Sequence, residues 1–106
     1  MANDQHFLDF IMEQLEELGD VRYRKMFGEA TLYYNDKVVG MICDNQLFLK
    51  QTKAGKVLQE EVVLAPPYEG SKDFFLITNE LDEASKLCEL IRESAKELSV
   101  LRKKRK

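Results

Sequence analysis

Histidine, cysteine and proline are rare in this chain, and tryptophan is absent. Its 106 residues include one histidine, two cysteines and two prolines. A catalytic base needs an oriented partner, and the lone His6 offers none. A zinc site needs about four ligands at short spacing, which His6 and the distant Cys43 and Cys88 do not supply. The sequence therefore predicts a protein that is not an enzyme and that holds no metal or cofactor.

Long apolar runs and phosphate-binding loops are missing as well. No apolar stretch approaches the ~20 residues that cross a bilayer, so no membrane span is predicted. The first residues show neither a basic segment nor an apolar leader, which argues against secretion. Gly55-Lys56 lacks the upstream glycine and the following serine or threonine of a phosphate loop. With Cys43 and Cys88 interpreted as reduced thiols, these features predict a cytoplasmic protein.

Lysine and arginine are absent from the first 20 positions and dense at the last five, which are Arg102, Lys103, Lys104, Arg105 and Lys106. Five of the 16 bases lie in this tail, so the remaining 11 bases face 19 acids, a net charge of −8. An acidic body does not attract a phosphate backbone, so a contact with nucleic acid would need the tail or a local basic patch. Three interpretations of the tail are open: it complements the negative end of a preceding helix, it is a frayed end with no further role, or it contacts phosphate or an acidic protein surface.

What the chain does contain is a series of short patterned segments that predict an α+β fold. Apolar residues recur at helical spacing near both ends, and three apolar runs in between are separated by Asn35-Asp36 and Asp44-Asn45, which favour turns. The predicted order is helix, four strands, short helix, strand and helix, over residues 4–18, 21–27, 30–34, 38–43, 46–50, 52–61, 73–78 and 80–98. We expect one two-layer domain over residues 1–101, with helices packed on one face of an antiparallel sheet of about five strands, and a basic tail at 102–106.

The apolar residues of these segments form the expected core. Those predicted to lie largely inside it are Phe7, Ile11, Leu15, Leu32, Ile42, Leu47, Leu49, Phe75, Ile77, Leu87, Ile91 and Leu98. Asn3 or Asp4 can cap the first helix, Thr52 the short one and Asn79 the last one. Residues 64–70 contain both prolines and are predicted to form a connector.

The segment Val38–Cys43 is apolar on both faces, which is typical of a strand at the centre of a sheet. Because helices are expected on one face of the sheet only, the other face of this strand must be covered by some other part of the protein or by a partner chain. An exposed apolar patch of this kind usually marks a contact surface. The pattern therefore predicts a homodimer.

Three kinds of function remain open from the residues themselves: a domain that acts through protein contacts, a direct nucleic-acid binder, and a small-ligand or enzymatic domain whose site forms only in the fold. The candidate contact residues are Arg22, Arg24 and Lys25 together with the tail, Arg102, Lys103, Lys104, Arg105 and Lys106. Tyr33, Tyr34 and Phe48 raise the alternative of a stacking platform for single-stranded nucleic acid. Against it, this sheet lacks interleaved basic residues, and packing alone favours aromatics on strands.

A further set of motifs runs over nearly the whole chain. The set comprises Tyr23–Glu29 with its Met26-Phe27-Gly28 core, Leu32–Tyr34, Lys37–Gly40, Leu47–Lys50, Pro67–Lys72 and Leu87–Ile91. Together these motifs resemble the N-terminal domain of the TfoX/Sxy family, best known for bacterial regulators of natural competence, and in particular its stand-alone members. The resemblance implies a regulatory domain without catalytic residues, which works with a DNA-binding activator of the cyclic-AMP receptor protein type.

Overall fold

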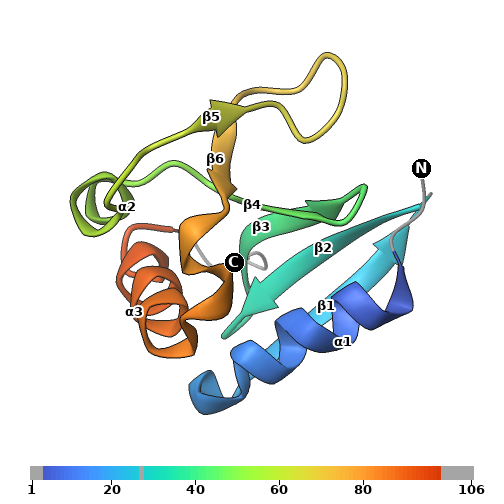
Figure 1. Ribbon diagram of the computed structural model, residues 1–106, viewed down its shortest axis with the longest axis horizontal. Coiled ribbons are helices and arrows are strands. Elements are labelled where there is room, and N and C mark those ends of the chain that lie inside the picture. Colours follow the sequence, from blue (N-terminus) through green and yellow to red (C-terminus); the bar gives the residue numbers. More distant parts are fainter. Residues whose placement is uncertain (1–3, 27, 99–106) are drawn as a thin grey trace, which may run out of the picture.

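A six-stranded antiparallel sheet with helices on one face makes up the structure (Figure 1). The computed structural model describes residues 4–26 and 28–98. The strands are β1 Val21–Met26, β2 Glu29–Tyr34, β3 Lys37–Cys43, β4 Gln46–Leu49, β5 Leu64–Ala65 and β6 Phe74–Ile77. The helices are α1 Gln5–Gln14, α2 Lys53–Leu58 and α3 Ala84–Ala95, with two 3-10 helices, η1 Glu16–Leu18 and η2 Asn79–Asp82. The α+β class is confirmed, with six strands rather than about five.

The additional strand, β5, lies at one edge of the sheet, whose order is β1-β2-β3-β4-β6-β5. Leu64 pairs with Phe75 and Ala65 with Phe74, although this segment was predicted to be part of a connector. Two residues are too few to show the alternation that identifies a strand. The prolines that follow them indicated a loop, so β5 was missed.

Two-residue turns join the central strands. Asn35 and Asp36 connect β2 to β3, Asp44 and Asn45 connect β3 to β4, and all four have φ between 51° and 66°. Positive φ at both positions defines a type I′ turn, whose twist matches the strands it joins. Asn and Asp tolerate this conformation better than other residues with a side chain. Both predicted turns are confirmed.

The core lies between the helices and one face of the sheet, which we call the inner face. Its buried members are Leu8, Ile11, Leu15, Ala30, Leu32, Val39, Ile42, Leu47, Leu49, Phe75, Ile77, Leu87, Cys88, Leu90, Ile91 and Ala95. Ten of the twelve predicted core residues are among them. Phe7 and Leu98 are only half-buried against this cluster, because one lies in the first turn of α1 and the other beyond the end of α3.

The first helix begins as predicted but ends early. The Asp4 side chain caps α1 by accepting a hydrogen bond from the backbone N–H of His6 at 3.0 Å. The helix stops at Gln14, and η1 follows in place of a helix that continues to residue 18. In the short helix α2, the predicted cap is confirmed, since Thr52 Oγ1 accepts from the backbone N–H of Gly55 at 2.9 Å.

The last helix also differs from its prediction. It begins at Ala84 rather than residue 80, and Asn79 starts the separate helix η2 instead of capping α3. The break has a contact across the core: Gln14 Nε2 donates to the carbonyl oxygen of Leu81 at 2.7 Å. A continuous helix would use that carbonyl for its own i+4 hydrogen bond.

Candidate protein-contact surface

The face of the sheet opposite the helices is built from rows of paired side chains. Alternate residues of a strand point to opposite faces, so the residues between the inner-face positions lie on this side, which we call the open face. One row crosses five strands through Arg24, Thr31, Met41, Phe48 and Leu76. A second row contains Arg22, Tyr33 and Val38. Among the described residues no helix covers this face, because α1, α2 and α3 all contribute side chains to the cluster on the inner face (Figure 1).

The centre of the open face is apolar. Tyr33, Val38, Met41 and Leu76 are each half-buried, and Phe48, which pairs with Met41 and Leu76 on the neighbouring strands, is 3% exposed. The strand β3 is therefore central and apolar on both faces, as its sequence predicted. Half-exposed apolar side chains on a face without helices supply area that a partner can bury.

Two arginines border this apolar centre along β1. The guanidinium of Arg22 bonds Asp36 Oδ1 through Nη2 at 2.6 Å and lies 5.3 Å from the centroid of the Tyr33 ring. Arg24 is exposed, and its guanidinium has no hydrogen-bond or ion-pair partner among residues 4–26 and 28–98. These two predicted contact residues thus lie on the open face. Arg22 is already oriented by Asp36 and Tyr33, and Arg24 can pair with a group of a partner.

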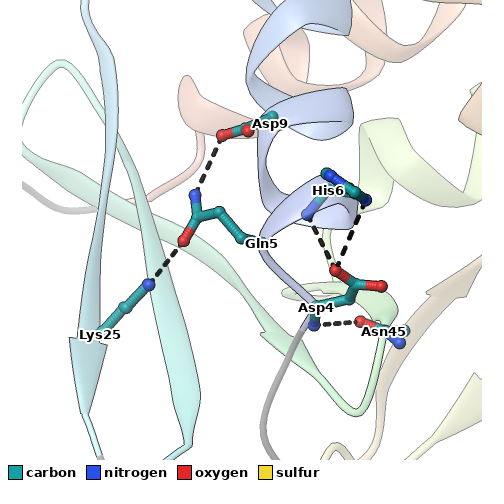
Figure 2. Close-up of polar contacts among 6 residues, drawn as sticks. All are labelled: Asp4, Gln5, His6, Asp9, Lys25 and Asn45. Atoms are coloured by element: carbon teal, nitrogen blue, oxygen red, sulfur yellow. Dashed lines mark hydrogen bonds and ion pairs between the residues drawn. The ribbon is translucent and has the colours of Figure 1, made fainter.

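Lys25, the third predicted contact residue, lies on the other side of β1. Its Nζ donates to Gln5 Oε1 at 2.7 Å, and Gln5 Nε2 in turn donates to Asp9 Oδ1 at 3.0 Å (Figure 2). The same amide reaches the Tyr23 hydroxyl at 3.2 Å. Lys25 therefore ties β1 to α1 and does not join Arg22 and Arg24 in one patch. The tail residues Arg102, Lys103, Lys104, Arg105 and Lys106 lie outside the described residues.

The groups with nucleophilic or metal-binding chemistry are dispersed. The side chain of His6 is 95% exposed, and its Nδ1 lies 4.0 Å from Asp4 Oδ1. Burial, and then the negative charge of Glu29, raises the pKa of the Cys43 thiol to about 11, and burial raises the pKa of Cys88. Both thiols stay protonated near neutral pH, which makes them poor nucleophiles. Within the described ranges, no three His, Cys, Asp or Glu residues gather as a metal site would require.

Two further features lie away from the open face. A surface groove of about 420 Å³ separates α2 from α3 and is lined by Lys53, Ala54, Val57, Leu58, Glu89 and Glu93. At its end, the Glu97 carboxylate accepts from the backbone N–H groups of Lys53 and Ala54, each at 2.9 Å. These hydrogen bonds, that of Ala54 first, hold the pKa of Glu97 below its ordinary value. No local sequence pattern indicates this second cap, because Glu97 is remote along the chain from Lys53 and Ala54.

The part of the chain that the structure describes has no helix of the length and apolar character needed to span a membrane.

The comparisons with known proteins agree with the motifs in the strands and in α3. Residues 13–98 match the family model described as the TfoX N-terminal domain. A protein of Spirochaeta aurantia, described as an uncharacterized 12.7 kDa protein in the trpE 5′ region, is 38% identical over 95 residues. That alignment covers 90% of this chain and 83% of the Spirochaeta protein.

Proposed function

The chain belongs to the TfoX N-terminal domain family, and from that premise we propose that it is a non-enzymatic adaptor domain that acts by binding another protein. The open face of the sheet supports this proposal. Its half-exposed side chains include Tyr33 and Met41, two arginines lie at its border, and aromatic residues, methionine and arginine are the types enriched at protein interfaces. Its apolar centre offers area to bury, Arg22 offers a charged group that Asp36 and Tyr33 hold in place, and Arg24 offers an exposed one.

The resemblance to TfoX/Sxy regulators extends the proposal to the process in which the domain acts and to a first candidate for its protein partner. In this proposal the domain works in the cytoplasm as a regulator of transcription. The partner is a DNA-binding activator of the cyclic-AMP receptor protein type, and the domain touches the activator rather than the DNA. The acidic body supports this division of labour, because the net charge of −8 outside the tail repels phosphate.

One observation favours a second candidate, a direct binder of single-stranded nucleic acid. Arg22 stacks over Tyr33 on an open sheet face, with Arg24 on the same side of the strand. Aromatic and arginine side chains of this kind are used to stack unpaired bases. This candidate predicts that labelled single-stranded DNA binds with a strong salt dependence and that Tyr33→Ala weakens the binding.

A matched pair of valine substitutions tests the adaptor proposal. Val38 lies in the open face, whereas Val57 lies on α2 with 82% of its surface exposed. Immobilised wild-type protein, Val38→Glu and Val57→Glu are exposed to lysate of the source organism, and the retained proteins are quantified by mass spectrometry. We expect Val57→Glu to retain the same protein as wild type, and Val38→Glu to lose it by about tenfold or more, because a carboxylate placed in an apolar interface is costly to desolvate. Equal retention by all three proteins would contradict the proposal.

A further inference from the structure

Strand β1 forms a free edge of the sheet. Among residues 4–26 and 28–98 it pairs only with β2, at one end of the strand order β1-β2-β3-β4-β6-β5. Four of its six residues are exposed, and along ~20 Å of strand its outer backbone groups face away from the sheet. An edge of this length can accept another strand through main-chain hydrogen bonds.

The charges of this edge follow the two-residue period of a strand. Arg22 and Arg24 lie on the open face, and between them Tyr23 points to the inner face, where Lys25 is held by Gln5. A shallow hollow of about 260 Å³ lies at this position, lined by Arg22, Tyr23, Arg24 and Tyr33. A strand added beside β1 would place its own alternate side chains next to both arginines. Opposite charges at directly paired positions stabilise such a ladder, and like charges destabilise it.

The same rule argues against a second copy of this chain as the added strand. When two copies of β1 pair antiparallel about a two-fold axis, the open face of one sheet continues into the open face of the other. Even-numbered residues of one copy therefore lie opposite even-numbered residues of the other. Arg22 then lies opposite Arg24 of the other copy, or Arg24 lies opposite itself. Either register brings guanidinium groups together, so the edge disfavours self-pairing and favours a segment that carries acids.

We propose that the partner protein adds an extended acidic segment to the free edge of β1, as a seventh strand, with acids at positions i and i+2 that pair with Arg22 and Arg24. This inference rests on the proposed adaptor function, since it names the chemistry of the segment that the adaptor binds. The contrasting explanation is that these charges only protect the edge from aggregation, as they do in many proteins. That explanation predicts no binding of an added strand.

A synthetic peptide serves as the probe. A fluorescein-labelled octapeptide that alternates threonine and glutamate is titrated with the protein and followed by fluorescence anisotropy, and exchange of the β1 backbone amides is followed by NMR. Two control peptides carry lysine in place of glutamate, or the same four glutamates in one block. We expect saturable binding of the alternating acidic peptide, binding weaker by about tenfold for Arg24→Glu, and slower amide exchange in residues 21–26.

The matched control is Lys72→Glu, which makes the same change of charge at an exposed site at the far end of the sheet, next to Phe74. It should alter the affinity by less than about twofold, because its charge lies beyond the Debye length from the edge. The inference is overturned if the alternating peptide does not bind, if the blocked peptide binds equally well, if Lys72→Glu weakens binding as much as Arg24→Glu, or if the β1 amides gain no protection. If capture of the host protein still depends on Val38, any of these results removes only the seventh strand and leaves the adaptor proposal intact.

Discussion

Gly55 lies inside α2, where the ring of Phe75 and the hydroxyl of Thr52 leave no room for a methyl group. Helix propensity alone predicts that Gly55→Ala stabilises the protein, because alanine is better than glycine by about 1 kcal/mol in a helix. The packing predicts the opposite, since Phe75 is fully buried and a new Cβ would have to displace its ring. We expect Gly55→Ala to lower the free energy of unfolding by roughly 1–3 kcal/mol in urea titrations.

The control for Gly55→Ala is Lys56→Ala, one residue further along the same helix and exposed to solvent. That change should stay within about 0.5 kcal/mol of wild type. A stabilised Gly55→Ala protein would show that the ring of Phe75 moves aside without cost.

Glu97 makes α2 sensitive to acid. Its pKa is held below the ordinary value of 4.5 by the backbone N–H groups of Ala54 and Lys53, so its contribution to stability is complete above pH 4.5. The contribution is lost as the pH falls through the lowered pKa of the folded state. We therefore expect Glu97→Gln to lower the Tm at pH 7, and the difference from wild type to shrink below pH 4.5.

The comparison for Glu97 is Glu61→Gln, which removes a charge from an exposed residue in the segment after α2. Its Tm difference should be small and should not follow the same pH dependence. A Glu97→Gln difference that persists unchanged to pH 2 would mean that the carboxylate charge is not what holds α2.

At the scale of single residues, the sequence predicts those turns and helix caps that depend on residues nearby in the chain. The positive φ of Asn35, Asp36, Asp44 and Asn45, and the caps of Asp4 and Thr52, all follow from residues within a few positions. The Glu97 cap joins residues more than 40 positions apart, and the contact between Arg22 and Asp36 depends on the register in which β1 pairs with β2. No local pattern contains that information.

On the scale of elements, α3 is the helix that covers the centre of the inner face. Leu87, Leu90 and Ile91 are each at most 1% exposed, and all three lie in the core cluster. Leu87→Ala should cost roughly 2–5 kcal/mol in the free energy of unfolding, because the lost methyl groups leave a cavity that the surrounding layers fill only in part. Equilibrium urea denaturation, with the folded and the unfolded baselines both recorded, would give this free-energy difference.

Glu89→Ala is the matched change on the solvent side of α3, and it should alter stability by less than about 0.5 kcal/mol. If Leu87→Ala cost as little as Glu89→Ala, α3 would not pack on the sheet as described.

Periodicity predicted the existence of every long element but not their limits. The helical spacing of residues 80–98 is continuous, yet the chain breaks between η2 and α3, where Gln14 bonds the carbonyl of Leu81. The candidate site shows the same limit. Arg22, Arg24 and Lys25 were grouped because they are close in sequence, whereas the alternation of a strand separates Lys25 from the two arginines. A strict use of that alternation would have placed Lys25 on the opposite face from the two arginines.

For the molecule as a whole, charge is divided between the two layers. Twelve of the 19 acids lie in residues 1–20 and 80–97, the segments that contain α1 and α3. The open face carries Arg22 and Arg24 around an apolar centre. Two copies that met through their open faces would therefore bury apolar area while keeping their helical layers on opposite outer sides. Such a contact leaves the edge of β1 free.

We expect this contact to produce a weak to moderate homodimer, which the protein partner displaces from the same face. Sedimentation equilibrium at high micromolar concentration should show a reversible dimer for wild type and for Val57→Glu. Val38→Glu should stay monomeric, because it places a carboxylate in the apolar centre. A wild-type protein that remains wholly monomeric at that concentration would rule the homodimer out.

The basic tail gives the last prediction at this scale. Residues 102–106 lie outside the described residues, and they are the densest positive segment of an otherwise acidic chain. Removing them should leave the free energy of unfolding almost unchanged, since a charge near a helix end contributes only about 0.3–1 kcal/mol. If the tail contacts phosphate, its five bases can supply a slope of at most about −4 to −5 in log affinity against log salt, at ~0.9 for each neutralised phosphate.

For duplex DNA we expect no tight binding at physiological salt, with or without the tail, because the net charge of −8 elsewhere repels the phosphates that the tail attracts. Gel-shift or anisotropy titrations of the full chain and of the chain without residues 102–106, each at three salt concentrations, measure this directly. A protein partner with an acidic surface should behave differently, since its binding would weaken on removal of the tail and lose part of its salt dependence. Tight duplex binding that disappears with the tail would contradict the expectation and would favour nucleic-acid binding over the adaptor function.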